Sequence, residues 1–140
     1  MRIAVVDGQG GGIGRAIVDK LRKELPEDVE IIALGTNSAA TVLMLKAGAN
    51  EGATGENAIV VNTRDVDIIM GAIGILVTDA FMGEMTAGMA SAISSSNAKK
   101  VLIPLNRCNI EIAGLKSEPL PHHIEYAVKA VKDYIKNGVN

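Results

Sequence analysis

Aromatic side chains are scarce in this sequence, and their scarcity excludes one class of function. The chain has no Trp, and its aromatic residues are Phe81, Tyr126 and Tyr134. Proteins that bind single-stranded nucleic acid stack bases on aromatic side chains. An excess of basic residues is also absent, since 14 Lys and Arg stand against 16 Asp and Glu, a formal net charge of −2. We therefore expect no nucleic-acid partner.

Cysteine and long hydrophobic runs are lacking too. A single cysteine, Cys108, excludes an internal disulfide and is typical of a reducing cytosol. The apolar run from Ile68 to Val77 is too short to span a bilayer and is interrupted by Gly71 and Gly74. The N-terminus leads directly into an apolar strand pattern, without the features of a signal peptide. We expect a cytoplasmic protein that does not enter the membrane.

Glycine, in contrast, is concentrated in one stretch, Asp7–Arg15, with the sequence DGQGGGIGR. The apolar run Ile3–Val6 precedes it and predicts a buried strand. Apolar residues at intervals of four follow it from Ile13 to Leu25 and predict an amphipathic helix. A strand, a glycine loop and a helix N-terminus in this order bring backbone N–H groups and the positive helix end together. Such a loop is a ready anion site.

The spacing of these glycines selects between nucleotide motifs. The pattern G-x-G-x-x-G does not fit from either Gly8 or Gly10. The pattern G-x-x-x-G-x-G does fit, through Gly8, Gly12 and Gly14. This spacing resembles the dinucleotide loop of the short-chain dehydrogenase/reductase superfamily. The resemblance implies a dinucleotide ligand, while a tight structural turn that uses glycine only for chain reversal and packing is the alternative.

Two related activities are not expected. The ATP-binding Walker pattern requires Lys followed by Ser or Thr after the last glycine, where this chain has Arg15 and Ala16. Reductases of the superfamily need Tyr and Lys four residues apart, whereas Tyr126 and Lys129 are three apart. Their catalysis is therefore not transferred to this chain.

The remaining pattern alternates strands with helices. Further strands are predicted at Val29–Leu34, Asn50–Ala53, Val66–Met70 and Val101–Pro104. At 140 residues, this predicts a single α/β domain, residues 1–140, with a three-layer, Rossmann-like doubly wound sheet of about five mainly parallel strands. Two further elements are expected: a helix at Ile75–Met82 and a small edge strand or hairpin arm at Ile110–Ala113.

Ligands of such sheets bind in the crevice beyond the carboxyl ends of the strands. The second strand ends in Gly35-Thr36-Asn37-Ser38, without the carboxylate that usually holds the ribose of NAD. These side chains either cap the next helix or receive an anion, such as the 2′-phosphate of NADP. We expect NAD or NADP as the ligand. The predicted cleft residues are Gly8, Gln9, Gly10, Gly11, Gly12, Ile13, Gly14, Thr36, Asn37, Ser38, Gly71, Gly74, Asn106 and Arg107.

Three residues are candidates for chemistry. Asp79 is an acid within an apolar run, so a buried position would require a functional role or an internal cap. Arg107 has the geometry to clamp a carboxylate or phosphate, and Cys108 beside it is either a reactive thiol or an inert one. His122 and His123 lack further ligands in matching positions, and no metal site is expected.

Several segments together are similar to a family of short bacterial proteins of unknown function: Ile3–Gly14, Ala33–Asn37, Gly48–Asn57 and Pro104–Asn109. The resemblance implies that these loops belong together, and it implies no activity. Three hypotheses follow: a module that binds a nucleotide or dinucleotide of the NAD(P) type, a small enzyme acting on a phosphorylated metabolite, or a structural homo-oligomer. A small phosphate-bearing molecule is the expected ligand, and the apolar segment Ile73–Met82 is a candidate dimer interface.

Overall fold

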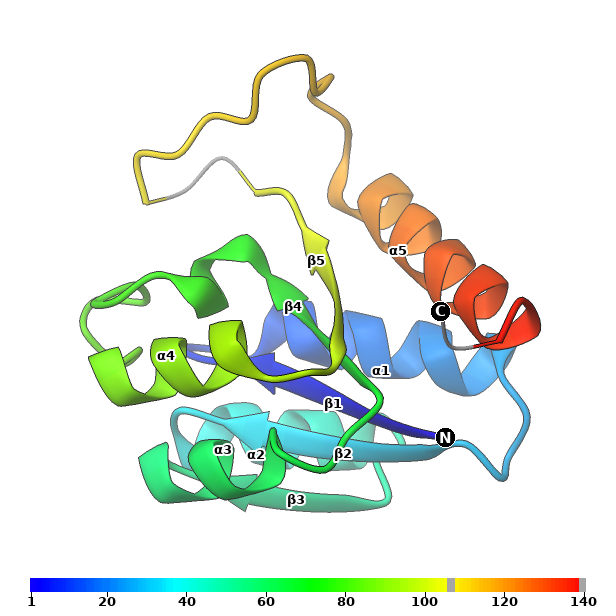
Figure 1. The fold of residues 1–140 in the computed structure, drawn as a ribbon, viewed down its shortest axis with the longest axis horizontal. Coiled ribbons are helices and arrows are strands. Elements are labelled where there is room, and N and C mark those ends of the chain that lie inside the picture. The colour runs from blue at the N-terminus through cyan, green and yellow to red at the C-terminus, as the bar shows by residue number, and fades with distance from the viewer. Residues whose placement is uncertain (106–107, 139–140) are drawn as a thin grey trace.

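Five short apolar segments form one fully parallel sheet. The computed structural model describes residues 1–105 and 108–138. Its strands lie in the order β3-β2-β1-β4-β5 (Figure 1), which confirms the predicted Rossmann-like doubly wound sheet. The strands are β1 (Arg2–Asp7), β2 (Glu30–Gly35), β3 (Glu51–Thr54), β4 (Ile68–Ala72) and β5 (Lys99–Ile103). In the centre of the sheet, Val5 pairs with Ala33 on one side and Met70 on the other.

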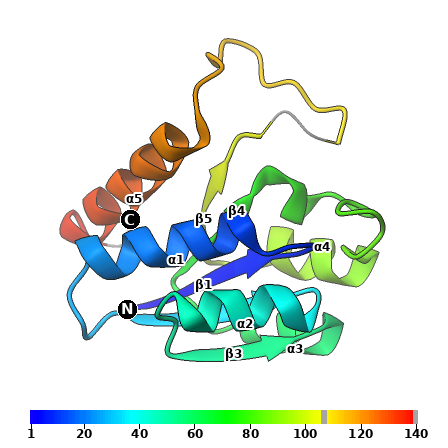
Figure 2. The same ribbon diagram turned by 180° about the vertical axis from the view of Figure 1, so that it is seen from behind.

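Helices cover both faces of the sheet, as predicted (Figures 1 and 2). One face carries α1 (Gly12–Glu24), α2 (Ser38–Lys46) and α5 (Leu120–Lys136). The opposite face carries α3 (Glu56–Asn62), the short 3-10 helix η1 (Ile73–Leu76) and α4 (Ala87–Ser95). The arrangement follows from the right-handed crossovers that connect parallel strands.

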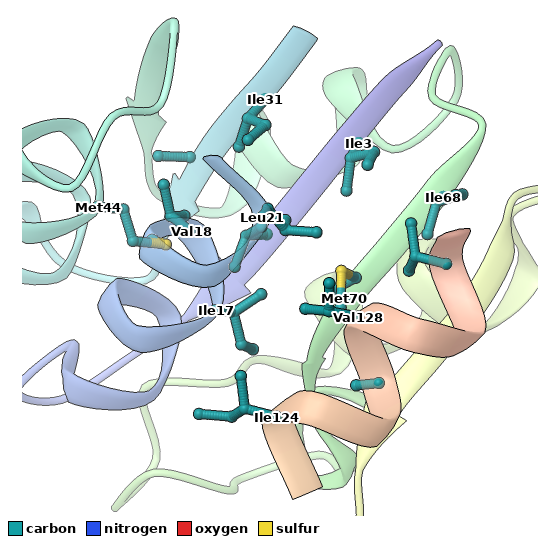
Figure 3. Close-up of a cluster of buried hydrophobic side chains, with 14 of the residues drawn as sticks. Ile3, Ile17, Val18, Leu21, Ile31, Met44, Ile68, Met70, Ile124 and Val128 are labelled. Atoms are coloured by element: carbon teal, nitrogen blue, oxygen red, sulfur yellow. The ribbon is translucent and has the colours of Figure 1, made fainter. Parts of the chain in front are cut away.

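Two apolar clusters hold these layers together. Alternate residues of β1 point to opposite faces, so Ile3 and Val5 enter one cluster while Ala4 and Val6 enter the other. Each large apolar side chain buried in this way contributes about 1.5–3 kcal/mol. Figure 3 shows the first cluster, in which side chains of α1 and α5 meet over the strands: Ile17, Leu21, Ile124, Val128, Ile3 and Met70.

The helix predicted at Ile75–Met82 was wrong. Only η1 is helical there, and turns occupy the chain from Thr78 to Glu84. The residues Asp79, Phe81 and Met82 have positive φ angles of 69°, 58° and 57°, which no right-handed helix contains. The apolar pattern arises because Ile75, Ala80 and Met85 are buried in the second cluster. These side chains therefore pack within the chain.

The edge strand predicted at Ile110–Ala113 was also wrong, because those residues adopt no strand and pair with no neighbour among the described residues. The segment 108–119 is irregular and extends away from the sheet in both views (Figures 1 and 2). Nearly all of its side chains are exposed. The alternation of apolar and polar residues from Ile110 to Ala113 therefore does not correspond to a buried and an exposed face of a strand.

Candidate functional site

The candidate site lies beyond the carboxyl ends of β1 and β4. The chain leaves β1 for the face of α1 and leaves β4 for the opposite face, so the two connections diverge and leave a crevice between them. Two pockets occur there, with volumes of about 280 Å³ and about 370 Å³. Both are lined by Gln9, Ile13 and Phe81, which makes them neighbouring parts of one cleft.

Three glycines of the loop are required by packing within the protein. Gly11 has a φ of 76°, and the N–H of Gly11 donates to the carbonyl of Gly8 at 3.0 Å to close the turn before α1. A methyl group at Gly8, Gly11 or Gly14 would meet a neighbouring atom at 2.6–2.7 Å. The atoms are Oγ1 of Thr36 for Gly8, Cα of Ala40 for Gly11 and Sδ of Met44 for Gly14. Packing thus requires glycine at Gly8, Gly11 and Gly14, whereas the G-x-x-x-G-x-G motif is formed by Gly8, Gly12 and Gly14.

Gly10 and Gly12 have no such requirement. Both are exposed, and a methyl group on either would meet nothing within 4 Å. The backbone N–H groups of Gly10, Gly12 and Ile13 also find no hydrogen-bond acceptor among the described residues. Three donors without an acceptor are therefore located at the N-terminus of a helix of 13 residues, and their residues line the 370 Å³ pocket.

Asp7, which the sequence analysis did not select, satisfies other donors of the loop. Its side chain is buried at the end of β1. One carboxylate oxygen accepts from the N–H of Gly8 at 2.8 Å, and the other accepts from the N–H of Gly14 at 2.6 Å. The acid thereby caps the first turn of α1 from the preceding strand. An acid closing an apolar strand directly before the glycines was the available signal for this role.

Glu84 brings a second carboxylate to the loop, from the turns that follow β4. Its Oε1 accepts from the N–H of Gln9 at 2.8 Å, from Oγ1 of Thr36 at 2.7 Å and from Nδ2 of Asn37 at 2.7 Å. The hydrogen bond from Thr36, followed by those from Gln9 and Asn37, outweighs burial and holds the pKa of Glu84 below its usual value of 4.5. No local pattern in the sequence announces this contact, because Gln9 and Glu84 are 75 residues apart.

The residues at the end of β2 are occupied by these contacts. Oδ1 of Asn37 accepts from the N–H of Ala40 at 2.9 Å, so Asn37 is the N-cap of α2. Of the two predicted roles, helix capping and anion binding, this confirms the first for Asn37. Its Nδ2 donates to the carbonyl of Gln9 at 2.8 Å and to Glu84. Thr36 directs its hydroxyl proton to Glu84 as well. Ser38 is exposed at the first position of α2.

The remaining predicted residues divide into three groups. Gly74 lines the 280 Å³ pocket together with Gln9, so the connections after β1 and β4 do face each other. Gly71 lies inside β4, where a methyl group would meet the carbonyl oxygen of Val6 at 2.7 Å, and is therefore a packing residue. Asn106 and Arg107 lie outside the described residues.

Two candidates for chemistry border the same pocket. Asp79 is exposed, which corrects the expectation of a buried acid. Its position is fixed through the backbone, since the N–H of Asp79 donates to the carbonyl of Met85 at 2.7 Å. Cys108 is exposed and lines the pocket too, with a φ of 60°.

Comparison with protein families places the chain. The family described as "Domain of unknown function (DUF3842)" matches residues 2–136. The chain belongs to this family. Because the match spans nearly the whole sequence, it confirms the predicted membership in a family of unknown function. No curated protein matches the sequence.

Two acidic side chains of the described residues line the cleft of this DUF3842 domain. Asp7 and Asp79 line the two pockets, and no Lys or Arg of residues 1–105 or 108–138 does so. Within the same residues, no three His, Cys, Asp or Glu side chains gather as metal ligands. None of the helices in this part of the chain has the length and apolar character needed to cross a membrane.

Proposed function

We propose that this DUF3842 domain binds a nucleotide or dinucleotide, of the NAD or NADP type, with its phosphates on the glycine loop. One observation carries the proposal: the N–H groups of Gly10, Gly12 and Ile13 have no acceptor among the described residues, and all three residues line the 370 Å³ pocket. Hydrogen bonds to a charged group contribute about 1.5–3 kcal/mol each. The positive end of α1 adds to this attraction.

The neighbouring pocket supports a ligand that also has an uncharged ring. Its walls are largely apolar. They come from the connections after β1 and β4, including Ile13, Ile73 and Phe81, and from Leu105 beyond β5. A flat heterocycle buries apolar surface in such a place while its phosphates stay at the loop.

Binding without catalysis is the form of the proposal that the residues favour. Cys108 and Asp79 line the pocket, but neither His122 nor His123 does. A thiol needs a base or another means of lowering its pKa to act as a nucleophile. The alternative of an enzyme acting on a phosphorylated metabolite would require turnover of the bound ligand, which product analysis detects directly.

The test is a titration of the wild-type chain and two variants of Gly12 with NAD, NADP, ADP and inorganic phosphate. Gly12→Asp places a carboxylate where a phosphate would bind, and Gly12→Asn provides a neutral side chain of the same size. Both are sterically accepted, since a methyl group at Gly12 meets nothing within 4 Å. An acid in the first turn of a helix stabilises it by about 0.3–1 kcal/mol, so loss of folding is not expected.

We expect a nucleotide at 100 times its Kd to stabilise the wild-type chain by about 2.7 kcal/mol. Gly12→Asp should abolish this gain, and Gly12→Asn should retain most of it. Equal stabilisation of both variants would show that the phosphates bind elsewhere. The absence of binding to any of the nucleotides would overturn the proposal.

A further inference from the structure

The end of β2 is the position where doubly wound folds read the ribose of a dinucleotide. An acid about 20 residues beyond the glycines usually accepts a hydrogen bond there from the ribose 2′-hydroxyl. In this chain the local sequence offers Thr36, Asn37 and Ser38, and no acid. The side chains of Thr36 and Asn37 are already engaged.

Glu84 supplies the missing carboxylate from a distant part of the chain. Its Oε1 lies 2.7 Å from both Oγ1 of Thr36 and Nδ2 of Asn37, directly at the end of β2. The same oxygen accepts from the N–H of Gln9 in the glycine loop. The carboxylate is therefore located between the two segments that would hold the phosphates and the ribose.

The second oxygen of Glu84 is available to a ligand. Oε2 makes no hydrogen bond with any described residue, and it is not among the buried side-chain atoms that lack a partner, so it is not fully buried. Three donors fix the other oxygen, and they also hold the pKa of Glu84 low, so the group is charged at neutral pH. Gly8 lies beneath it, where a methyl group would come within 3.3 Å of Oε1.

We infer that Glu84 accepts a hydrogen bond from the ribose of the ligand and selects an unmodified 2′-hydroxyl, as in NAD, over the 2′-phosphate of NADP. The inference rests on the proposed function and names the ligand class within it. A 2′-phosphate would meet a like charge at Glu84. It would also find the side-chain donors of Thr36 and Asn37 already committed to that carboxylate.

The experiment measures the affinities of the full chain for NAD and NADP by calorimetry at one ionic strength. The wild-type chain should bind NAD at least about tenfold more tightly than NADP. This first comparison requires no variant. Glu84→Gln preserves the shape of the side chain and one oxygen for its three donors, but removes the charge. In this variant the ratio of NAD affinity to NADP affinity should fall by about ten- to a hundredfold.

Glu56→Gln is the matched control. Glu56 is an acid in α3 that accepts a hydrogen bond from the hydroxyl of Thr86, two residues beyond Glu84, and it accepts none from Gln9, Thr36 or Asn37. Its substitution changes the net charge equally. The NAD to NADP ratio of Glu56→Gln should equal that of the wild-type chain.

Each result decides a different statement. A wild-type preference for NAD that is lost in Glu84→Gln and kept in Glu56→Gln supports the inference. If the wild-type chain binds both dinucleotides equally, or if Glu84→Gln keeps the preference, the assignment of Glu84 is overturned while nucleotide binding stands. If the wild-type chain binds neither dinucleotide nor ADP, the proposed function fails and the assignment fails with it.

Discussion

The connections after β1 and after β4 lie on opposite sides of one cleft and reverse the chain by different means. After β1, the left-handed positions are Gln9 and Gly11, and the turn closes within four residues. After β4, three residues with side chains are left-handed, namely Asp79, Phe81 and Met82. Each such residue costs about 1–2 kcal/mol relative to glycine. Glycine takes one of the two left-handed positions in the first connection and, at Gly83, one of the four in the second. The strain in the second connection is therefore larger, and the buried side chains of Ala80 and Met85 anchor it to the core.

The two connections also use their carboxylates differently. Asp7 is buried and serves its own loop, by accepting from Gly8 and Gly14. Glu84 is partly exposed and crosses the cleft to Gln9, Thr36 and Asn37. A local acid of the first kind completes a helix terminus, whereas a crossing acid of the second kind joins the two walls. The comparison predicts that substitutions in the first connection lower the free energy of unfolding more than substitutions in the second.

The largest effect is expected at Gly11. Gly11→Ala forces an alanine to a φ of 76° and places its methyl group 2.7 Å from the backbone of Ala40. The two costs together should lower the free energy of unfolding by about 3 kcal/mol, measured by urea denaturation. Gly12→Ala, one residue later, has open space and should leave stability unchanged or slightly raised. Equal effects of the two variants would refute the steric assignment of this loop.

A smaller loss is expected at Asp7. Asp7→Asn offers one oxygen to the two N–H donors of Gly8 and Gly14, so a buried donor then faces an NH₂ group. We expect thermal denaturation to show a loss of about 2 kcal/mol. Asp19→Asn removes an exposed acid of the same helix that pairs with Lys23, and should cost less than about 0.5 kcal/mol. A loss as small as that of Asp19→Asn would mean that Asp7 does not cap α1.

The smallest effect is expected at Glu84, and it should depend on pH. Glu84→Ala should cost about 1 kcal/mol at pH 7, because solvent partly replaces the lost acceptor. The folded-state pKa of Glu84 is lowered from 4.5, so the contribution is complete above pH 4.5 and is lost as the pH falls through the lower folded value. Urea denaturation at pH 7 and pH 3 should therefore show a smaller difference between wild type and variant at pH 3. A difference that grows in acid would contradict the hydrogen bonds to the charged form.

Features fixed by neighbours in the sequence could be predicted. The periodicity of the apolar residues gave the five strands and the helices on both faces. Gly48 follows the C-terminus of α2 with a φ of 121°, and Thr86 caps α4 by accepting from the N–H of Met89 at 3.1 Å, which are roles that glycine and threonine commonly take. In each case the deciding contact lies within a few residues.

Features fixed across the fold could not be predicted. Which glycines are indispensable depends on Ala40 and Met44 of another helix, and the sequence alone does not place that helix against the loop. The turns after β4 resemble a helix in their apolar pattern because their buried residues enter the same cluster that a helix would fill. Glu84 was missed for the same reason, since 48 residues separate it from Thr36.

Met82 gives the cleft a chemical reporter. Met82 is 93% exposed and lines the pocket beside Gln9, whereas Met1 is 38% exposed and Met44, Met70, Met85 and Met89 are buried. Peroxide converts accessible methionine to the sulfoxide and leaves packed methionine largely intact. Oxidation of this chain should therefore begin at Met82. The rate of sulfoxide formation at Met82, measured by mass spectrometry, should fall when a ligand occupies the cleft.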